Sequence, residues 1–266
     1  MRQPERRGPD LRHRYTIADT DVLSDEEVRR FIGDGSPDPQ INVALAWELL
    51  YRREPDLYDR LAQAERLHPA VIDWLPTGVD RIVEVGAGTG RLTLELVGRA
   101  RELVAIEPVA PFRKILERKL AQTEHGCSAG VIHGFFDDLP VPDDSADVVA
   151  VCSAFTSTPA HGGDAGLAEM ERVCRPGGCV VIVWPLSAEW LATRGYRHLS
   201  FPGEMFVEFS SEEEAAELTE IFYPAAAPEV RRNRWRRVPF RALGTEPPRD
   251  LAYKVMPEGD RSPPNG

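Results

Sequence analysis

Three alternating glycines at the end of a short apolar run form the part of this sequence best suited to chemistry. Residues 83–85 read Val-Glu-Val, and residues 86–90 read Gly-Ala-Gly-Thr-Gly before an amphipathic stretch begins. Glycine has no Cβ, so such a backbone can turn tightly between a strand and a helix and approach a ligand closely. A dinucleotide fingerprint needs its third glycine where Arg91 stands, so the pattern indicates a nucleotide-type loop and argues against a pyrophosphate ligand.

A carboxylate follows the next apolar run along the chain. Glu107 comes directly after residues 102–106, and it lies 21 residues beyond Gly86. An acid at the end of the second strand can accept hydrogen bonds from both hydroxyls of a ribose. The glycine loop, the acid and the order of the two strands together predict a site for a nucleoside cofactor.

The elements that position these residues are indicated by the texture of the chain from residue 81 onward. Short β-branched runs alternate there with amphipathic stretches, which is typical of βα units around a parallel sheet. Two later runs are expected to close that sheet with an antiparallel edge. The expected strands are residues 81–85, 102–106, 130–135, 146–152 and 179–184, followed by 230–243 and 250–256.

Amphipathic segments before the sheet predict a cap of helices. Ser24 and Glu27 have the spacing of a capping box, and an apolar face follows until Gly33 and Gly35. After Pro37 and Pro39, two further cap helices are expected over residues 41–53 and from residue 55 to about residue 67. Within the sheet region, helices are expected to start at Pro111 and to span residues 164–174 and 212–222, with a turn at residues 175–178.

Composition limits the classes of protein that fit. The chain has 266 residues and a net charge of −11, which repels a phosphate backbone and argues against nucleic-acid binding. No apolar stretch approaches the roughly 20 residues that cross a bilayer, and the start lacks the apolar core of a signal peptide. We therefore expect a cytoplasmic protein without membrane contact. The four cysteines include no Cys-x-x-Cys pair, so we expect buried thiols and no metal site.

Four blocks of residues give the chain a resemblance to a known family, the class I S-adenosylmethionine-dependent methyltransferases. The blocks are residues 83–90, 104–108, 134–140 together with 147–149, and 169–178. The resemblance implies a doubly wound α/β fold with a mostly parallel seven-stranded sheet, the Rossmann-like methyltransferase fold, here with an N-terminal helical cap. The expected organisation is a disordered start (1–20), the cap (21–78), the cofactor-binding domain (79–256) and a disordered tail (257–266).

The resemblance also implies how S-adenosylmethionine binds and leaves as S-adenosylhomocysteine. Glu84 would meet the amino group of the methionine moiety, and Glu107 would hold the ribose. The family often places an aspartate at the position of Phe135 to bind the adenine amino group, and Asp137 or Asp138 could supply that acid here. The remaining residues expected to contact the cofactor are Gly86, Ala87, Gly88, Gly90, Pro108, Phe135, Phe136 and Ser153.

Residues 153–164 form the loop that this architecture turns toward the methyl acceptor. His161 in this loop is the candidate general base, because imidazole titrates near neutral pH. The alternative is a histidine that only begins a helix beside Asp164. The arginine-rich segment 231–237 is interpreted as a solvated strand at a sheet edge. Aromatic residues that could wall an acceptor pocket, or simply pack in the core, are Trp47, Tyr51, Tyr58, Trp184, Trp190 and Tyr196.

Three functions follow from these observations. The first is a methyltransferase, acting as a monomer or homodimer on a small molecule through an O, N or C nucleophile. The second is a nicotinamide-dependent oxidoreductase, although neither Gly-x-Gly-x-x-Gly nor a Tyr/Lys hydride-transfer pair is present. The third is a regulatory protein that binds S-adenosylmethionine without turnover, since this superfamily has no obligatory catalytic residue in the acceptor loop.

Overall fold

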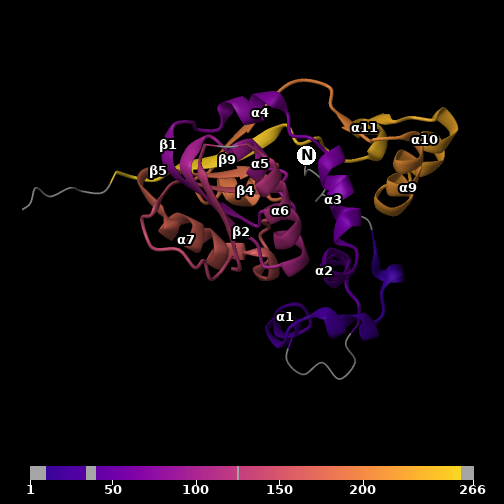
Figure 1. Ribbon diagram of the computed structural model, residues 1–266, viewed down its shortest axis with the longest axis horizontal. Helices are drawn as coiled ribbons and strands as arrows, with labels where there is room; N and C mark the ends of the chain where they lie inside the picture. Colours follow the sequence, from indigo (N-terminus) through magenta and orange to yellow (C-terminus); the bar gives the residue numbers. More distant parts are fainter. Residues whose placement is uncertain (1–9, 34–39, 125, 259–266) are drawn as a thin grey trace, which may run out of the picture.

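A twisted seven-stranded sheet forms the centre of the molecule (Figure 1). The structure is a computed structural model that describes residues 10–33, 40–124 and 126–258. The strand order is β3-β2-β1-β4-β5-β9-β6, in which β1 to β5 pair in parallel and β9 runs antiparallel between β5 and β6. This order confirms the expected doubly wound fold. The strands are β1 (Val79–Val85), β2 (Ala100–Ile106), β3 (Ser128–Ile132), β4 (Ala146–Cys152), β5 (Cys174–Val183), β6 (Arg197–Ser200) and β9 (Asp250–Val255).

Helices cover both faces of the sheet because successive strand residues point to opposite sides. Val83 and Val149 share a buried cluster with Met170 of α7, whereas Ile82 and Val148 belong to a second cluster with the cap. Both clusters consist almost wholly of apolar side chains, whose burial is the main driving force of folding. The helices of this region are α4 (Pro69–Trp74), α5 (Thr93–Leu96), α6 (Ala110–Gln122), α7 (Gly163–Val173) and α8 (Ala188–Ala192).

The cap consists of helices α1 (Asp25–Phe31), α2 (Val43–Arg53) and α3 (Pro55–Ala64), and α2 and α3 stand beside α6 (Figure 1). The capping box before α1 is present, because Glu27 N–H donates to Ser24 Oγ at 3.3 Å and Ser24 N–H donates to Glu27 Oε2 at 2.8 Å. Gly33 follows α1 with a φ of +85° and ends it as expected, whereas Gly35, Pro37 and Pro39 lie outside the described residues.

The chain before the cap differs from expectation. Residues 10–22, mostly expected to be disordered, include the 3-10 helices η1 (Arg12–Arg14) and η2 (Ile17–Val22). Leu11 is fully buried in the same cluster as the cap, and the hydroxyl of Tyr15 donates to Glu54 at 2.7 Å. Tertiary contacts therefore order a segment that lacks any apolar periodicity of its own. Residues 1–9 and 259–266 lie outside the described part of the chain.

A small C-terminal lobe packs against α3 on the side away from the sheet (Figure 1). It comprises residues 206–243, with Arg60 of α3 bound to Glu214 at 2.8 Å and to Glu217 at 2.6 Å. We refer to these residues as the C-terminal lobe. Its elements are β7 (Phe206–Glu208), α9 (Glu212–Phe222), α10 (Ala227–Asn233), β8 (Arg237–Pro239) and α11 (Phe240–Leu243).

Three strand predictions were wrong in whole or in part. Residues 230–243 form the end of α10, the short strand β8 and α11, and the strand that closes the sheet beside β9 is β6. The expected strand 130–135 ends at Ile132, since residues 133–138 turn and Asp138 N–H donates to Phe135 O. Residues 175–178, expected to form a turn, belong to β5. A register shift against β4 accommodates them, and Gly177 has a φ of +74°.

Candidate active site

A cavity of about 1520 Å³ lies at the carboxyl ends of β1, β2, β4 and β5, between the cap and the C-terminal lobe. Parallel sheets of this type bind ligands outside the carboxyl ends of their strands. The cavity exceeds the roughly 300–1,000 Å³ of an ordinary small-molecule pocket. Its size suits two ligands bound side by side.

The glycine loop after β1 forms one wall of the cavity. Gly86 has a φ of +69°, and a Cβ on it would stand 2.8 Å from the ring of Phe136, so the position requires glycine. Ala87 and Gly88 also line the cavity, whereas Gly90 lies outside its wall. A Cβ on Gly90 would meet Leu116 of α6 at 2.8 Å, so this glycine lets the loop pack on α6.

Glu107 stands at the end of β2, with its side chain 4% exposed. Its carboxylate accepts hydrogen bonds from Gly88 N–H at 2.7 Å and from Val109 N–H at 2.8 Å. Burial raises the pKa of Glu107 to about 7, against the opposing effect of these two donors. The two bonds fix the carboxylate toward the glycine loop, and its further lone pairs remain able to accept from a ligand.

Glu84 lies at the end of β1 and is 1% exposed. Its Oε2 atom has no hydrogen-bond partner in the structure. Burial raises the pKa of Glu84 to about 8, against the opposing effect of the nearby Thr93 hydroxyl, and the charge of Glu107 adds to the rise. A buried polar atom without a partner is uncommon in folded proteins. This one borders the cavity, where a ligand with a donor or a positive charge would satisfy it.

The turn after β3 was expected to contact adenine. Phe135, Phe136 and Pro108 all line the cavity, as expected. Asp137 does not, because its carboxylate binds Arg30 of α1 at 2.8 Å. The guanidinium of Arg30 also lies 4.2 Å from the centre of the Phe135 ring. Asp137 is therefore engaged with the cap, and Asp138 also lies outside the wall, so the contact of either carboxylate with adenine stays a prediction.

Strained backbone marks the ends of β4 and β5 at the cavity. Ser153 follows β4 with a φ of +55°, and Trp184 follows β5 with a φ of +52°. Left-handed conformations cost a residue with a side chain roughly 1–2 kcal/mol, and such strain gathers at functional sites. Both residues line the cavity, and Ser153 is one of the residues expected to contact the cofactor.

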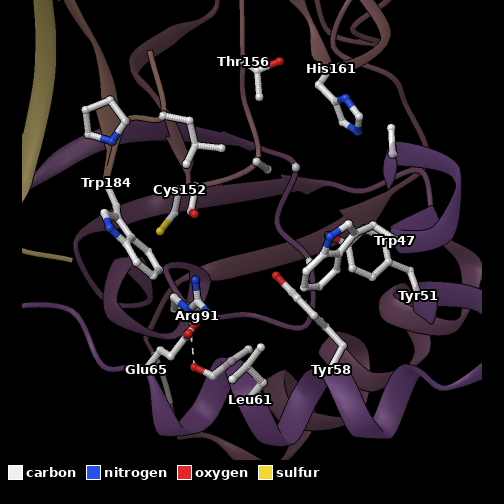
Figure 2. Close-up of a pocket in the computed structure, with 18 of the residues that line it drawn as sticks. Trp47, Tyr51, Tyr58, Leu61, Glu65, Arg91, Cys152, Thr156, His161 and Trp184 are labelled. Carbon is white, nitrogen blue, oxygen red and sulfur yellow. Dashed lines mark hydrogen bonds and ion pairs between the residues drawn. The ribbon is translucent and has the colours of Figure 1, made fainter. Parts of the chain in front are cut away.

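His161 also lines the cavity and meets a residue that the sequence did not single out. Its Nε2 lies 3.5 Å from Oε1 of Glu48, a buried carboxylate on α2 whose Oε2 accepts from Arg52 at 2.7 Å. Figure 2 shows His161 and Thr156 across the cavity from Arg91 and Glu65. Glu48 and Arg52 have the i,i+4 spacing of an ordinary helix-surface ion pair. For this reason the sequence gave no sign that Glu48 lies beside His161.

A second buried pair was also missed. Arg91, directly after the glycine loop, donates to Glu65 Oε2 at 2.6 Å, and the hydroxyl of Tyr223 donates to the other oxygen of Glu65. The side chains of Arg91 and Glu65 are 11% and 6% exposed. This network joins the glycine loop, the end of α3 and the C-terminal lobe. The sequence showed Arg91 directly after the loop, but it could not show that Glu65 and Tyr223, from distant segments, lie beside it.

Most of the predicted aromatic wall is present. Tyr51 and Tyr58 line the cavity from the cap with Trp47, while Trp184 and Trp190 line it from the other side. Tyr196 does not, because its ring is buried beside the sheet and its hydroxyl donates to Glu171 at 3.2 Å. For Tyr51 and Tyr58, burial raises the pKa, to about 12 in Tyr58, so both phenols stay protonated.

The remaining candidates lie apart from the site. Arginines of segment 231–237 are exposed as expected, on α10 and β8, where Arg231, Arg234 and Arg237 pair with glutamates. The four cysteines form no disulfide with one another; Cys174 is buried as expected, the other three are half-buried, and Cys152 lines the cavity. No group of three or more potential metal ligands occurs within the described residues.

The sequence matches known proteins over the region that contains the glycine loop and Glu107. Residues 82–178 match a family described as a methyltransferase domain. An uncharacterized methyltransferase from Mycobacterium bovis is 37% identical over 119 residues, 44% of this chain and 44% of that protein. A ubiquinone/menaquinone biosynthesis C-methyltransferase from Geotalea daltonii is 29% identical over 149 residues, 53% of this chain and 62% of that protein. The chain therefore spans about half the length of these curated relatives.

Solved structures share the fold. A chain of the complex between the Haloferax volcanii Trm112 methyltransferase activator and a methyltransferase superposes with a TM-score of 0.50 and 18% identity, over 78% of this chain and 96% of that one. Along the described segments, no helix has the length and apolar character needed to cross a membrane. The matches confirm the resemblance of residues 82–178 to methyltransferases.

Proposed function

We propose that this chain, whose residues 82–178 form a methyltransferase domain, transfers a methyl group from S-adenosylmethionine to a small molecule bound in the same cavity. The observation that carries the proposal is the pair of buried carboxylates, Glu84 and Glu107, at adjacent strand ends beside the glycine loop. The match covers only part of the relatives' length, so their activities do not by themselves support the proposal. The proposal therefore rests on the geometry of this site.

The residues present fit the cofactor. The unpartnered Oε2 of Glu84 suits the ammonium group of the methionine moiety, and Glu107 suits the ribose hydroxyls because its carboxylate is already fixed by two backbone donors. Phe136 and Pro108 offer apolar surfaces for adenine. The cofactor supplies an activated methyl group, so the protein must align the acceptor and exclude water. The cap and the C-terminal lobe border the cavity, where their side chains can align the acceptor.

His161 is the proposed general base. It faces the cavity, and Glu48 stands where it can orient the imidazole. A base matters when the acceptor must lose its proton during attack. We expect His161→Gln to lower kcat by about 100-fold or more, which corresponds to the usual contribution of general-base catalysis, and to remove the rise of the rate with pH. An unchanged rate and pH profile would leave His161 as a structural residue.

Two measurements test the function itself. Isothermal titration calorimetry with S-adenosylhomocysteine and with NAD tests the cofactor, and we expect only the first to bind. Transfer of labelled methyl groups from S-adenosylmethionine to components of a small-molecule extract tests turnover. Binding without transfer to any compound would favour a regulatory protein, and binding of NAD would favour an oxidoreductase. The family match supports neither alternative. Monomer or homodimer remains a prediction.

A further inference from the structure

One face of α2 borders the cavity beside His161. Residues 44, 47, 48 and 51 of this helix line the space, at the i, i+3, i+4 and i+7 positions that share one side of a helix. Figure 2 shows two of them, Trp47 and Tyr51, on the same side of the cavity as His161. The face carries an alanine, these two aromatic rings and one charged side chain, that of Glu48.

The carboxylate of Glu48 has one oxygen bound and one without a donor. Its Oε2 accepts from Arg52 at 2.7 Å, whereas its Oε1 accepts no hydrogen bond from any described residue. Nε2 of His161 stands 3.5 Å from Oε1, beyond the roughly 2.7–3.2 Å of an N–H···O hydrogen bond. The side chain of Glu48 is only 7% exposed, and a buried polar atom normally has a partner. A ligand in the cavity can supply the missing donor.

The charges behind Glu48 leave an excess of negative charge. Arg52 binds Glu48 and also Glu27 of α1, so one guanidinium serves two carboxylates. Burying an unbalanced charge is costly unless a group of opposite sign completes the cluster. His161 does not supply that charge in the role proposed above, because a general base must be unprotonated to accept a proton. A positive group placed at Oε1 from the cavity would complete the cluster.

The other charges of the lining also favour a cation over an anion. Within the described residues, seven carboxylates and three arginines line the cavity, and no lysine does. The three arginines already bind carboxylates, in the pairs Arg91–Glu65, Arg30–Asp137 and Arg241–Glu204. An anionic acceptor would therefore meet guanidinium groups that are already neutralised, whereas a cationic acceptor would meet the oxygen of Glu48 that lacks a donor.

We propose that the methyl acceptor is an amine, bound as its ammonium ion with one N–H donating to Oε1 of Glu48 and with its nitrogen beside His161. This inference rests on the proposed function. Trp47 and Tyr51 support it, because the faces of aromatic rings attract cations. The position is also near the cofactor residues, since burial raises the pKa of Glu107 to about 7 and the negative charge of Glu48 adds to that rise.

Both residues beside the nitrogen have a part in the transfer. His161 accepts one proton from the ammonium group, which frees the nitrogen lone pair. That lone pair forms the new bond to the methyl carbon, and the electron pair of the broken carbon–sulfur bond stays on sulfur. Positive charge returns to the nitrogen as the bond forms, and Glu48 stabilises it there. The products are the N-methylated ammonium ion, S-adenosylhomocysteine and protonated His161.

Three probe molecules of similar size test the inference on the full chain saturated with S-adenosylhomocysteine. At neutral pH, 2-phenylethylamine is a cation, 2-phenylethanol is neutral and phenylacetate is an anion. Calorimetry is expected to show binding of the amine and at least tenfold weaker binding of the other two, the difference that one charge-assisted hydrogen bond makes. Binding of the alcohol or the carboxylate within tenfold of the amine, or no binding of the amine, would overturn the inference.

The substitution Glu48→Gln locates the bound amine. Glutamine keeps an oxygen for Arg52, and Arg52 keeps its second partner Glu27, but the negative charge is lost. We expect binding of 2-phenylethylamine to weaken by about 10- to 150-fold. Retained affinity for S-adenosylhomocysteine shows that the variant is folded. An unchanged affinity for the amine would refute the inference.

Glu65→Gln is the matched control for the loss of charge. Glu65 lines the same cavity, but its two oxygens are already bound by Arg91 and Tyr223. If the amine were attracted only by the general negative charge of the cavity, both variants would weaken its binding equally. We expect a much smaller loss in Glu65→Gln than in Glu48→Gln, and equal losses would contradict the contact assigned to Glu48.

The sulfonium of S-adenosylmethionine is a second cation that Glu48 could hold. Affinities for S-adenosylmethionine and S-adenosylhomocysteine, measured in the unaltered protein and in Glu48→Gln, separate the two roles, and we expect their ratio to stay the same. A loss confined to S-adenosylmethionine would assign Glu48 to the cofactor and overturn the inference. If S-adenosylhomocysteine binds but the amine does not, only the acceptor class fails. If S-adenosylhomocysteine itself does not bind, the proposed function fails as well.

Discussion

Replacing Glu84 with glutamine should stabilise the free protein. The carboxyl is buried without a partner for Oε2, and burial raises its pKa from 4.5 to about 8. At pH 7 the unfolded chain has lost the proton while the folded chain retains it. Because pH 7 lies 2.5 units above the pKa of the unfolded chain, keeping the carboxyl protonated lowers the free energy of unfolding by about 3 kcal/mol, at about 1.36 kcal/mol per pH unit. Glutamine does not ionise, so Glu84→Gln is expected to gain this stability, roughly 6 °C in Tm for a chain of this size.

The sign of the pH dependence follows from the same shift. Below pH 4.5 the carboxyl of Glu84 is protonated in both states, and the two proteins should differ little. As the pH rises from 4.5 to about 8, ionisation favours the unfolded chain and the unaltered protein loses stability relative to the variant. The difference should be about 1 kcal/mol at pH 5 and about 3 kcal/mol at pH 7. Thermal unfolding followed by circular dichroism at several pH values measures it.

The same substitution, Glu84→Gln, should weaken binding of the cofactor. A charge-assisted hydrogen bond from the ligand ammonium to Glu84 contributes about 1.5–3 kcal/mol, so affinity for S-adenosylhomocysteine should fall about 10- to 150-fold. Asp80→Asn is the control, because Asp80 lies on the same strand with its side chain 78% exposed and should change neither property. The reasoning is refuted if Glu84→Gln is no more stable at pH 7, or if its advantage does not grow with pH.

Three further predictions concern the loop, the ribose and the N-terminal segment. Glu107→Gln should lower affinity for S-adenosylhomocysteine by about 10- to 150-fold in calorimetry, and unchanged affinity would remove the ribose role. Gly86→Ala should destabilise the protein by about 1–3 kcal/mol in chemical denaturation, because its Cβ would collide with Phe136 at a positive φ. Leu11→Ala should cost about 2–5 kcal/mol in the same assay, whereas Ile17→Ala, at an exposed site, should cost at most about 0.5 kcal/mol.

Local sequence patterns predicted helix starts and strand bounds correctly where these depend on residues close together in the chain. The capping box of Ser24 and Glu27 formed as expected, and β4 has the expected bounds. Such signals depend on neighbouring residues, whose steric and hydrogen-bonding preferences act within one turn or strand. Residues 230–243 show the limit of this reasoning, because Pro228 starts α10 and Arg234 ends it in a left-handed conformation. The five arginines of residues 231–237 were interpreted there as part of a solvated strand.

The sequence by itself determined the side of the cavity formed by the glycine loop and Glu107. Parallel strands end at one edge of a sheet, so a glycine loop after one strand and an acid after the next lie close together. Only the tertiary structure decided the rest of the cavity lining. His161 meets Glu48, and Glu65 binds both Arg91 and Tyr223, across separate elements of the chain. No local pattern encodes such pairs, because they form only when packing excludes water and brings the cap and the C-terminal lobe against the sheet.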